Sequence, residues 1–328
     1  MDEINKIHHK DFMMNDLPDK SVQLILADPP YFEVKGSFDF VWKSFDDYLK
    51  DVEKWAIECK RLLADNGTLF WYGHAKKIAY AQIIFDKHFN LINNLVWNKG
   101  SFMGLEESEG LRSFAPCTER ILMYSKERAN YGTRDLLKLA GEKISPFARL
   151  MKQRMKELNI NGSELAELQL SKNGNKTGWI SNKISGSEIP TKEQWELICN
   201  KLNIENNYET LKTQRENEME IYLKNQRKFD NSFKLQEVMN FSNEAQKTGS
   251  KYAHDTCKPE TLTRALILTC SRPNDLVFIP FAGSGTEVTM AIKEGRKAIG
   301  FDIEEKYVEM GNKRTDIIKA QPSLFAGS

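Results

Sequence analysis

The sequence predicts an α/β fold, a sheet with crossover helices, into which an all-helical domain is inserted. Strand-like and helix-like segments alternate over residues 1–130, and the alternation resumes near the end of the chain. Such alternation is typical of sheets whose strands are joined by helices. Between these halves, over about residues 141–240, strand signals disappear and polar helical segments dominate. A chain of 328 residues is long enough for one large domain with an insertion.

The elements of the first half follow from apolar spacing. Residues 21–27 form an apolar run that ends at two prolines, which predicts a short buried strand. Residues 47–63 repeat apolar side chains at helical spacing and end at an Asp-Asn-Gly turn signal. Three further strands are expected over residues 68–72, 91–97 and 120–124.

The second half repeats the pattern. We expect helices over residues 258–270, 286–294 and from 304 onward, with strands over 275–279 and 297–301. The predicted segments are the first half of the sheet domain, the helical insert, the second half of the sheet domain and a mobile tail: 1–140, 141–240, 241–320 and 321–328.

The composition excludes several classes of protein. Lys and Arg total 47 against 46 Asp and Glu, so the net charge of +1 gives no global attraction to a polyanion. The five cysteines form no C-x-x-C pair, and we therefore expect reduced thiols and no metal site. The sequence shows neither a long apolar run nor a signal peptide, which predicts a cytoplasmic protein without a membrane segment.

The first motif, Asp-Pro-Pro-Tyr at residues 28–31, directly follows the first predicted strand. Prolines cannot continue a ladder and they stiffen the backbone, so the motif holds a carboxylate and an aromatic ring at a rigid strand end. By itself the motif suggests a pocket.

The second motif, "DLVFIPFAGSGT" at residues 275–286, is a strand that enters a glycine loop before a helix. Glycines let backbone N–H groups approach a ligand, and Thr286 can cap the helix. Asp302, at the end of the next strand, can accept both hydroxyls of a ribose or can cap a helix. The loop lacks the Gly-Lys-Ser/Thr of a P-loop and the spaced glycines of a dinucleotide site, so a ligand with a ribose and no phosphate fits better.

Together the two motifs resemble the amino-group DNA methyltransferases that use S-adenosylmethionine. The catalytic motif precedes the cofactor motif, which resembles the circularly permuted β group of that family. The resemblance covers about residues 1–130 and 245–315, and it implies a Rossmann-like sheet, mostly parallel with an antiparallel edge strand. It departs from the family at Ile279, where an acid that contacts the cofactor is usual, and at Cys257, where Gln is common.

The resemblance also implies roles for individual residues. The catalytic residues would be Asp28, Pro29, Pro30 and Tyr31. "HKDF" at 9–12 resembles the segment that contacts the cofactor's adenine, "HDTCKPETLTRALI" at 254–267 nominates Lys258 for the methionine carboxylate, and "ERILMYSK" at 119–126 resembles a strand beside the target base. The expected cofactor residues are Asp11, Phe12, Asp28, Lys258, Pro280, Phe281, Gly283, Ser284, Gly285, Thr286 and Asp302.

The chemistry explains the first motif. The exocyclic amine of adenine is a poor nucleophile because its lone pair is shared with the ring. The Asp28 carboxylate and the Pro29 carbonyl can accept its hydrogens and localise that pair, while Tyr31 stacks on a base flipped out of the duplex. In the family Asp at the first position is commoner among adenine N6 enzymes and Ser among cytosine N4 enzymes, so adenine is favoured. Phe32 and Trp42 either wall this pocket or pack in the core.

The insert, over residues 150–204, loosely resembles a repressor-type helix-turn-helix. Residues 143–183 hold eight Lys or Arg against three Glu, a local excess that suits phosphate contacts. The second helix of the motif would present five residues to the major groove: Lys176, Trp179, Ser181, Asn182 and Lys183. The alternative is a solvated helical bundle with Trp179 in its core.

The leading hypothesis is therefore a site-specific adenine N6 methyltransferase of double-stranded DNA whose insert helps to choose the target. The alternatives are a cytosine N4 enzyme, an RNA or protein-glutamine methyltransferase, and an inactive DNA-binding regulator. By resemblance alone, a homodimer and a cognate restriction endonuclease are further candidate partners.

Overall fold

The computed structural model describes residues 2–33, 41–100, 117–127, 140–241 and 258–320. Predictions that concern Cys257, the other residues of 254–257, or the tail over 321–328 lie outside these ranges. The chain forms two compact units, one from Met1–Ala129 with Arg227–Ser328 and the other from Asn130–Gln226. Within the described ranges, no helix is both long and apolar enough to cross a membrane.

The first unit is built on one eight-stranded sheet with the order β1-β8-β7-β2-β3-β5-β4-β6. The strands are β1 (Lys6–His9), β2 (Val22–Ala27), β3 (Leu63–Gly73), β4 (Asn90–Asn98), β5 (Thr118–Ser125), β6 (Val238–Asn240), β7 (Leu276–Ile279) and β8 (Lys297–Asp302). β5 is antiparallel to both of its neighbours, β3 and β4, and the other pairs are parallel. The predicted fold class is confirmed. The reversed strand lies inside the sheet and not at its edge, because β4 and β6 lie beyond it.

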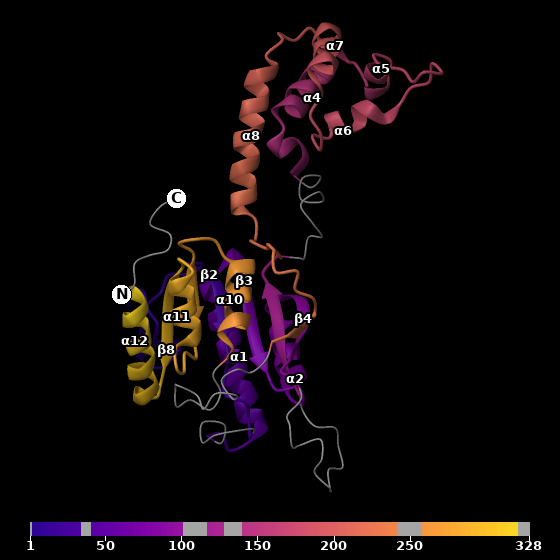
Figure 1. Cartoon of the computed structure of the whole chain (residues 1–328). Coiled ribbons are helices and arrows are strands. Elements are labelled where there is room, and N and C mark those ends of the chain that lie inside the picture. Colours follow the sequence, from indigo (N-terminus) through magenta and orange to yellow (C-terminus); the bar gives the residue numbers. More distant parts are fainter. Residues whose placement is uncertain (1, 34–40, 101–116, 128–139, 242–257, 321–328) are drawn as a thin grey trace. The chain divides into compact units, whose positions relative to one another are not determined.

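Helices cover both faces of this sheet (Figure 1). They are α1 (Phe45–Leu62), α2 (Ile78–Phe85), α10 (Glu260–Cys270), α11 (Thr286–Lys293) and α12 (Glu305–Lys319), with a short 3-10 helix, η1 (Phe12–Met14). Val22, Ile25 and Ala27 of β2 lie in the hydrophobic core with α1 and α2, whereas Leu24 and Leu26 lie in the core with α10, α11 and α12. Because side chains on both faces of β2 are buried, its sequence does not alternate between apolar and polar residues.

The Asp-Asn-Gly turn signal lies inside β3 and does not precede it. Val22 pairs with Leu63 and Leu24 with Thr68, so one residue of β2, Gln23, lies opposite four of β3 and the ladder bulges at residues 64–67. A side chain on Gly67 would approach Leu63 Cδ1 to 2.6 Å, so glycine allows the chain to bend here.

The second unit is helical. Its elements are η3 (Gly141–Ile144), α4 (Pro146–Leu158), α5 (Gly162–Ala166), η4 (Gly178–Ile180), α6 (Ser181–Ile184), α7 (Lys192–Leu202) and α8 (Tyr208–Asn225). Ser145 caps α4, and capping boxes begin α5 and α7. The unit has its own core, which includes Phe147, Trp195 and Leu202. It ends at Gln226, whereas we expected the insert to reach residue 240.

Candidate active site

The chemically important side chains meet at one edge of the sheet. Asp28 follows β2 and Asp302 ends β8, and both strands run in the same direction. Parallel strands bring their carboxyl ends to one edge, where ligands bind in open α/β sheets. Because β5 is reversed, Glu119 near its beginning reaches the same edge. Lys99, just after β4, arrives there as well.

Asp28 lies at the centre of a buried charged cluster. The Tyr31 hydroxyl donates to Asp28 Oδ1 at 2.6 Å, and Lys258 Nζ lies 2.8 Å from Asp28 Oδ2. Lys258 Nζ also lies 3.2 Å from Glu119 Oε2. The Lys258 side chain is only 5% exposed, so its positive charge depends on these carboxylates. The structure therefore brings Tyr31 and Lys258, which are 227 residues apart in the sequence, into contact with Asp28.

Glu119 and Lys99 complete the cluster. Lys99 Nζ lies 2.5 Å from Glu119 Oε1. Burial alone would raise the pKa of Glu119, but Lys258 and Lys99 outweigh it and lower that pKa to about 2. Burial would likewise lower the pKa of Lys258, but Asp28 and Glu119 raise it above its usual range. Lys258 and Glu119 are thus charged at neutral pH.

The depressed pKa of Glu119 predicts a loss of stability in acid. The ionised carboxylate stabilises the fold fully above its ordinary pKa of 4.5, and this contribution disappears as the pH falls toward 2. We expect wild-type protein to lose on the order of 2–3 kcal/mol of unfolding free energy more than Glu119→Gln between pH 5 and pH 2.5. Urea denaturation at both pH values measures this difference. Equal losses in the two proteins would contradict an ionised, paired Glu119.

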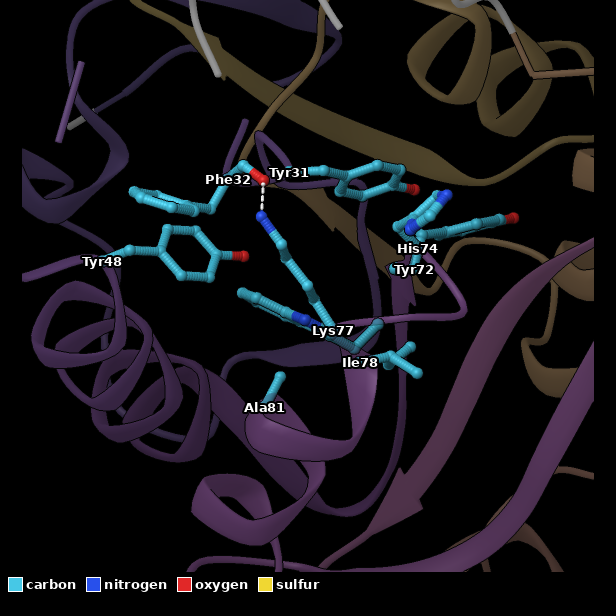
Figure 2. A pocket seen from close by; sticks show the side chains of 10 residues that line it. Tyr31, Phe32, Tyr48, Tyr72, His74, Lys77, Ile78 and Ala81 are labelled. Carbon is cyan, nitrogen blue, oxygen red and sulfur yellow. Dashed lines mark hydrogen bonds between the residues drawn. The ribbon is translucent and has the colours of Figure 1, made fainter. Parts of the chain in front are cut away.

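A cavity with aromatic walls adjoins Tyr31 (Figure 2). It is narrow and partly open to solvent, and its lining comprises Tyr31, Phe32, Tyr48, Trp71, Tyr72, Gly73, His74, Lys77, Ile78 and Ala81. Lys77 Nζ donates to the Phe32 carbonyl oxygen and lies 4.5 Å from the centre of the Phe32 ring. Tyr48 donates to the Pro30 carbonyl at 3.2 Å, which ties α1 to the Asp-Pro-Pro-Tyr turn. Phe32 both walls the cavity and packs in the core, whereas Trp42 packs in the core and donates to Asp51.

The glycine loop follows β7 and depends on left-handed backbone. Gly283 and Gly285 have φ angles of 48° and 79°. A Cβ atom on Gly285 would lie 2.8 Å from Ile7 Cδ1 and 2.9 Å from Gly311 Cα. Gly285 precedes the first turn of α11 without a side-chain cap, so the prediction that Thr286 caps this helix is wrong. Thr286 Oγ1 instead accepts from Arg314 Nη1 at 3.2 Å, because Arg314 reaches it from α12.

Asp302 ties this loop to β8. Its Oδ2 accepts from the Gly283 N–H at 2.7 Å and its Oδ1 from the Glu304 N–H at 2.9 Å. Burial raises the pKa of Asp302, and these two N–H groups oppose that rise. Each carboxylate oxygen keeps a second lone pair, so a ligand hydroxyl can still donate to it. Asp302 therefore orders the segment before α12 and remains able to bind a ribose.

The other predicted cofactor residues surround the same loop. Asp11 caps η1 by accepting from the Met13 N–H at 2.9 Å. Phe12 is 2% exposed and meets the half-buried Phe281 ring edge-on at 5.2 Å. Pro280 is buried, and the Ser284 carbonyl accepts from Arg314 Nη1 at 2.9 Å. Phe281 thus offers more ring surface to a ligand than Phe12 does.

The predicted DNA-contacting residues lie in the helical unit around α6. Lys176 pairs with Glu167 at 2.7 Å, and Lys183 pairs with Glu188. Asn182 donates to that same Glu188 at 3.1 Å, although Asn182 and Ser181 are exposed. Trp179 is half-buried against the core of the unit. The positive charge expected at this surface is thus partly balanced by acids of the same unit.

Sequence reasoning missed Glu119, Lys99 and the cavity residues Tyr48 and Lys77. Glu119 belongs to the segment 119–126, which was expected near the target base. Its position at the sheet edge follows from the antiparallel direction of β5, which the sequence does not show. Glu287 was missed too: burial, with Asp28 adding to it, raises its pKa to about 7. Its signal was a carboxylate in the first turn of a helix that also carries Val288, Met290 and Ala291.

The sequence is similar to a family of known proteins. A family model described as DNA methylase matches residues 22–313. The chain is 25% identical to the Type II methyltransferase M.HinfI of Haemophilus influenzae, with 94% of this chain and 66% of that protein covered. It is 27% identical to the DNA adenine methyltransferase YhdJ of Escherichia coli (96% and 84% covered) and to the Type II methyltransferase M1.MboII of Moraxella bovis (94% and 96%). The chain thus spans 66% of the length of M.HinfI and most of the other two proteins.

Two solved structures share the fold. The M1.HpyAVI–SAM complex matches with a TM-score of 0.50 and 17% identity, covering 94% of this chain and 98% of that one. The cytosine-N4-specific PvuII DNA methyltransferase matches with a TM-score of 0.50 and 14% identity, covering 93% and 85%.

Proposed function

The chain belongs to the DNA methylase family, and from that membership we propose that it transfers a methyl group from S-adenosylmethionine to the N6 amine of adenine in double-stranded DNA. One observation carries the proposal: the Asp28 carboxylate, oriented by the Tyr31 hydroxyl, lies at the sheet edge beside an aromatic cavity. The names of two relatives, which are Type II methyltransferases, extend the proposal to a restriction-modification context with a cognate endonuclease.

The residues around the glycine loop suit S-adenosylmethionine. The Asp302 carboxylate has free lone pairs for ribose hydroxyls, and the half-buried Phe281 provides an apolar face near Asp11. The motif "GSGT" carries no lysine to neutralise a phosphate, which favours a nucleoside without one. When bound, S-adenosylmethionine supplies a methyl group on a positively charged sulfur. Lys258, nominated for its methionine carboxylate, would first have to exchange an acceptor in the Asp28 cluster.

The residues of this chain prepare the amine and orient the base. Asp28 accepts one hydrogen of the amine and the Pro29 carbonyl accepts the other, which localises the nitrogen lone pair. The adjacent Pro30 and the Tyr48 hydrogen bond hold that turn rigid, so little reorganisation is required. The cavity beside Tyr31 receives the flipped base, and flipping costs a few kcal/mol of lost stacking and pairing.

Two observations favour adenine over cytosine. The motif begins with Asp28, and the relative YhdJ is named a DNA adenine methyltransferase. The runner-up is cytosine N4 methylation, which one protein of the same fold carries in its name.

The class of acceptor is tested with methyl-labelled S-adenosylmethionine and the full chain. Duplex DNA without prior methylation, RNA and a mixture of protein acceptors are incubated in parallel. We expect label in DNA only. Label in RNA or protein without label in DNA would overturn the proposed substrate, and no label in any acceptor would favour a DNA-binding regulator.

The helical unit is proposed to read the DNA through the surface around α6. Replacing Lys176 and Lys183 with Ala should weaken DNA binding uniformly and reduce the salt slope of the binding constant by about 1–2. Titration of binding at several salt concentrations measures this. Lys192→Ala serves as the control, because Lys192 is an exposed lysine of the same unit that also pairs with an acid, Glu209. An unchanged slope in the double variant would reduce the unit to a scaffold.

A further inference from the structure

The Lys258 ammonium is surrounded by two carboxylates and three aromatic rings. Asp28 Oδ2 lies 2.8 Å and Glu119 Oε2 3.2 Å from its nitrogen. The ring centres of Tyr72, Tyr31 and Trp97 lie 5.1, 5.6 and 5.8 Å away. Such rings attract a cation through their negative faces. Either carboxylate, together with these rings, can therefore bind the ammonium.

This setting conflicts with the chemistry required of Asp28. Its Oδ1 accepts from Tyr31 and its Oδ2 is paired with Lys258, so each oxygen keeps one lone pair, and the pairing with an ammonium makes Oδ2 a weaker acceptor for a further hydrogen. An incoming amine needs one of them as its acceptor. Lys258 cannot leave Asp28 without another partner, because an unpaired buried ammonium is strongly destabilising.

We propose that Glu119 is a positioning residue that takes up the Lys258 ammonium and so releases Asp28 Oδ2 to the target amine. This role rests on the proposed function. Glu119 Oε2 is already within reach of Lys258, while Lys99 binds the other oxygen, Oε1. Glu119 Oε2 is thus available to Lys258, although the Tyr31 hydroxyl also lies 3.5 Å from it. Tyr72 and Trp97 keep contact with the ammonium as it shifts, and Lys258 remains near Asp28 throughout.

The arrangement also explains why four charges are gathered in a largely buried site. Asp28 and Glu119 balance Lys258 and Lys99, so the cluster is neutral before the base arrives. Transfer of Lys258 from one carboxylate to the other keeps every charge and needs no proton to enter or leave. If Asp28 were the only carboxylate near Lys258, the ammonium would have no second carboxylate to bind.

A double-mutant cycle tests this role in the full chain. The single-turnover rate of methyl transfer is measured at saturating cofactor and DNA for wild type, Glu119→Gln, Lys258→Met and the double variant. Gln keeps the size of the side chain and removes its charge, so we expect transfer to slow by about 10- to 100-fold, with DNA and cofactor dissociation constants within about twofold. The double variant should be no slower than Lys258→Met, because Glu119 acts through Lys258.

Two further variants separate charge from folding. Glu119→Asp keeps the charge on a shorter side chain and should be faster than Glu119→Gln. Glu53→Gln is the matched control, since Glu53 pairs with Lys87 and His88 outside the site, and its rate should equal wild type. Urea midpoints establish that each variant folds.

The outcomes distinguish the two proposals. A wild-type rate in Glu119→Gln, or rate losses that multiply in the double variant, would overturn the positioning role while leaving DNA methylation intact. The effects of the two substitutions could also be non-additive in the urea midpoints but additive in the transfer rate. Glu119 and Lys258 would then interact only to stabilise the fold, and the positioning role would be overturned. Absence of transfer by the wild-type chain would instead refute the proposed function.

Discussion

Replacing Asp28 with Asn is expected to lower the single-turnover rate of methyl transfer by about 10²–10³-fold. Asn has nearly the same size, but its amide is a weaker acceptor and can present its NH₂ group to the incoming amine. It also leaves Lys258 with Glu119 as its remaining carboxylate partner. Asp28 was among the expected cofactor residues, but the glycine loop after β7 keeps its own contact with Asp302, so we expect the dissociation constant for S-adenosylmethionine to change only a few-fold.

Rapid quenching with labelled cofactor measures that rate, and equilibrium dialysis measures the affinity. Asp65→Asn is the matched control, because Asp65 is an exposed partner of Lys20 at 2.8 Å and lies outside the site. A rate for Asp28→Asn within threefold of the control would remove Asp28 from the chemistry.

Replacing Gly285 with Ala is expected to destabilise the sheet unit and to weaken cofactor binding together. Residue 285 has a φ of 79°, which strains any side chain, and the new Cβ would collide with Ile7 and the backbone of Gly311. Strain and overpacking together should cost about 2–4 kcal/mol. Because the loop must shift to relieve the collision, the contact between Gly283 and Asp302 would be disturbed as well.

Gly174→Ala separates the two causes. Gly174 has a similar φ of 75°, but no heavy atom lies within 4 Å of the position its Cβ would take. We expect it to lose about 1 kcal/mol from backbone strain alone and to leave cofactor affinity unchanged. Thermal unfolding and equilibrium dialysis measure both proteins. If Gly285→Ala bound the cofactor as tightly as wild type, the glycine loop would not be part of that site.

The sheet could be predicted where local signals were strong. β2 is apolar on both faces because two cores enclose it, and its end is marked by Pro29 and Pro30. The glycine loop was predicted for a similar reason, since Gly283 and Gly285 adopt backbone that other residues rarely take. At such positions the local chemistry and the tertiary structure favour the same conformation.

Other elements depend on distant partners and leave little local signal. β1 has four residues, half of them histidine, and it forms because it pairs with β8, about 290 residues away. β6 has three residues and is held by β4, which is why the boundary expected at residue 240 differs from the end of the helical unit at Gln226. Short strands of this kind are stabilised by their neighbours in the sheet, not by their own composition.

Only those residues of the site that lie beside locally recognisable strand ends could be predicted. Asp28, Tyr31 and Asp302 follow strand ends that the sequence marks, so their convergence at one edge could be expected. Glu119 could not be placed, because only the reversed direction of β5 carries its beginning to that edge. The pairing of Lys258 with Asp28 joins residues far apart in the chain and has no local signature.

The central claim is that the exocyclic amine of adenine is the methyl acceptor, and nucleoside analysis tests it most directly. Unmethylated duplex DNA is incubated with the full chain and labelled S-adenosylmethionine, digested to nucleosides and separated by chromatography. The proposed function predicts label in N6-methyldeoxyadenosine with the wild-type chain and its loss with Asp28→Asn. Label confined to N4-methyldeoxycytidine would contradict adenine specificity, and label in neither nucleoside would contradict amino methylation altogether.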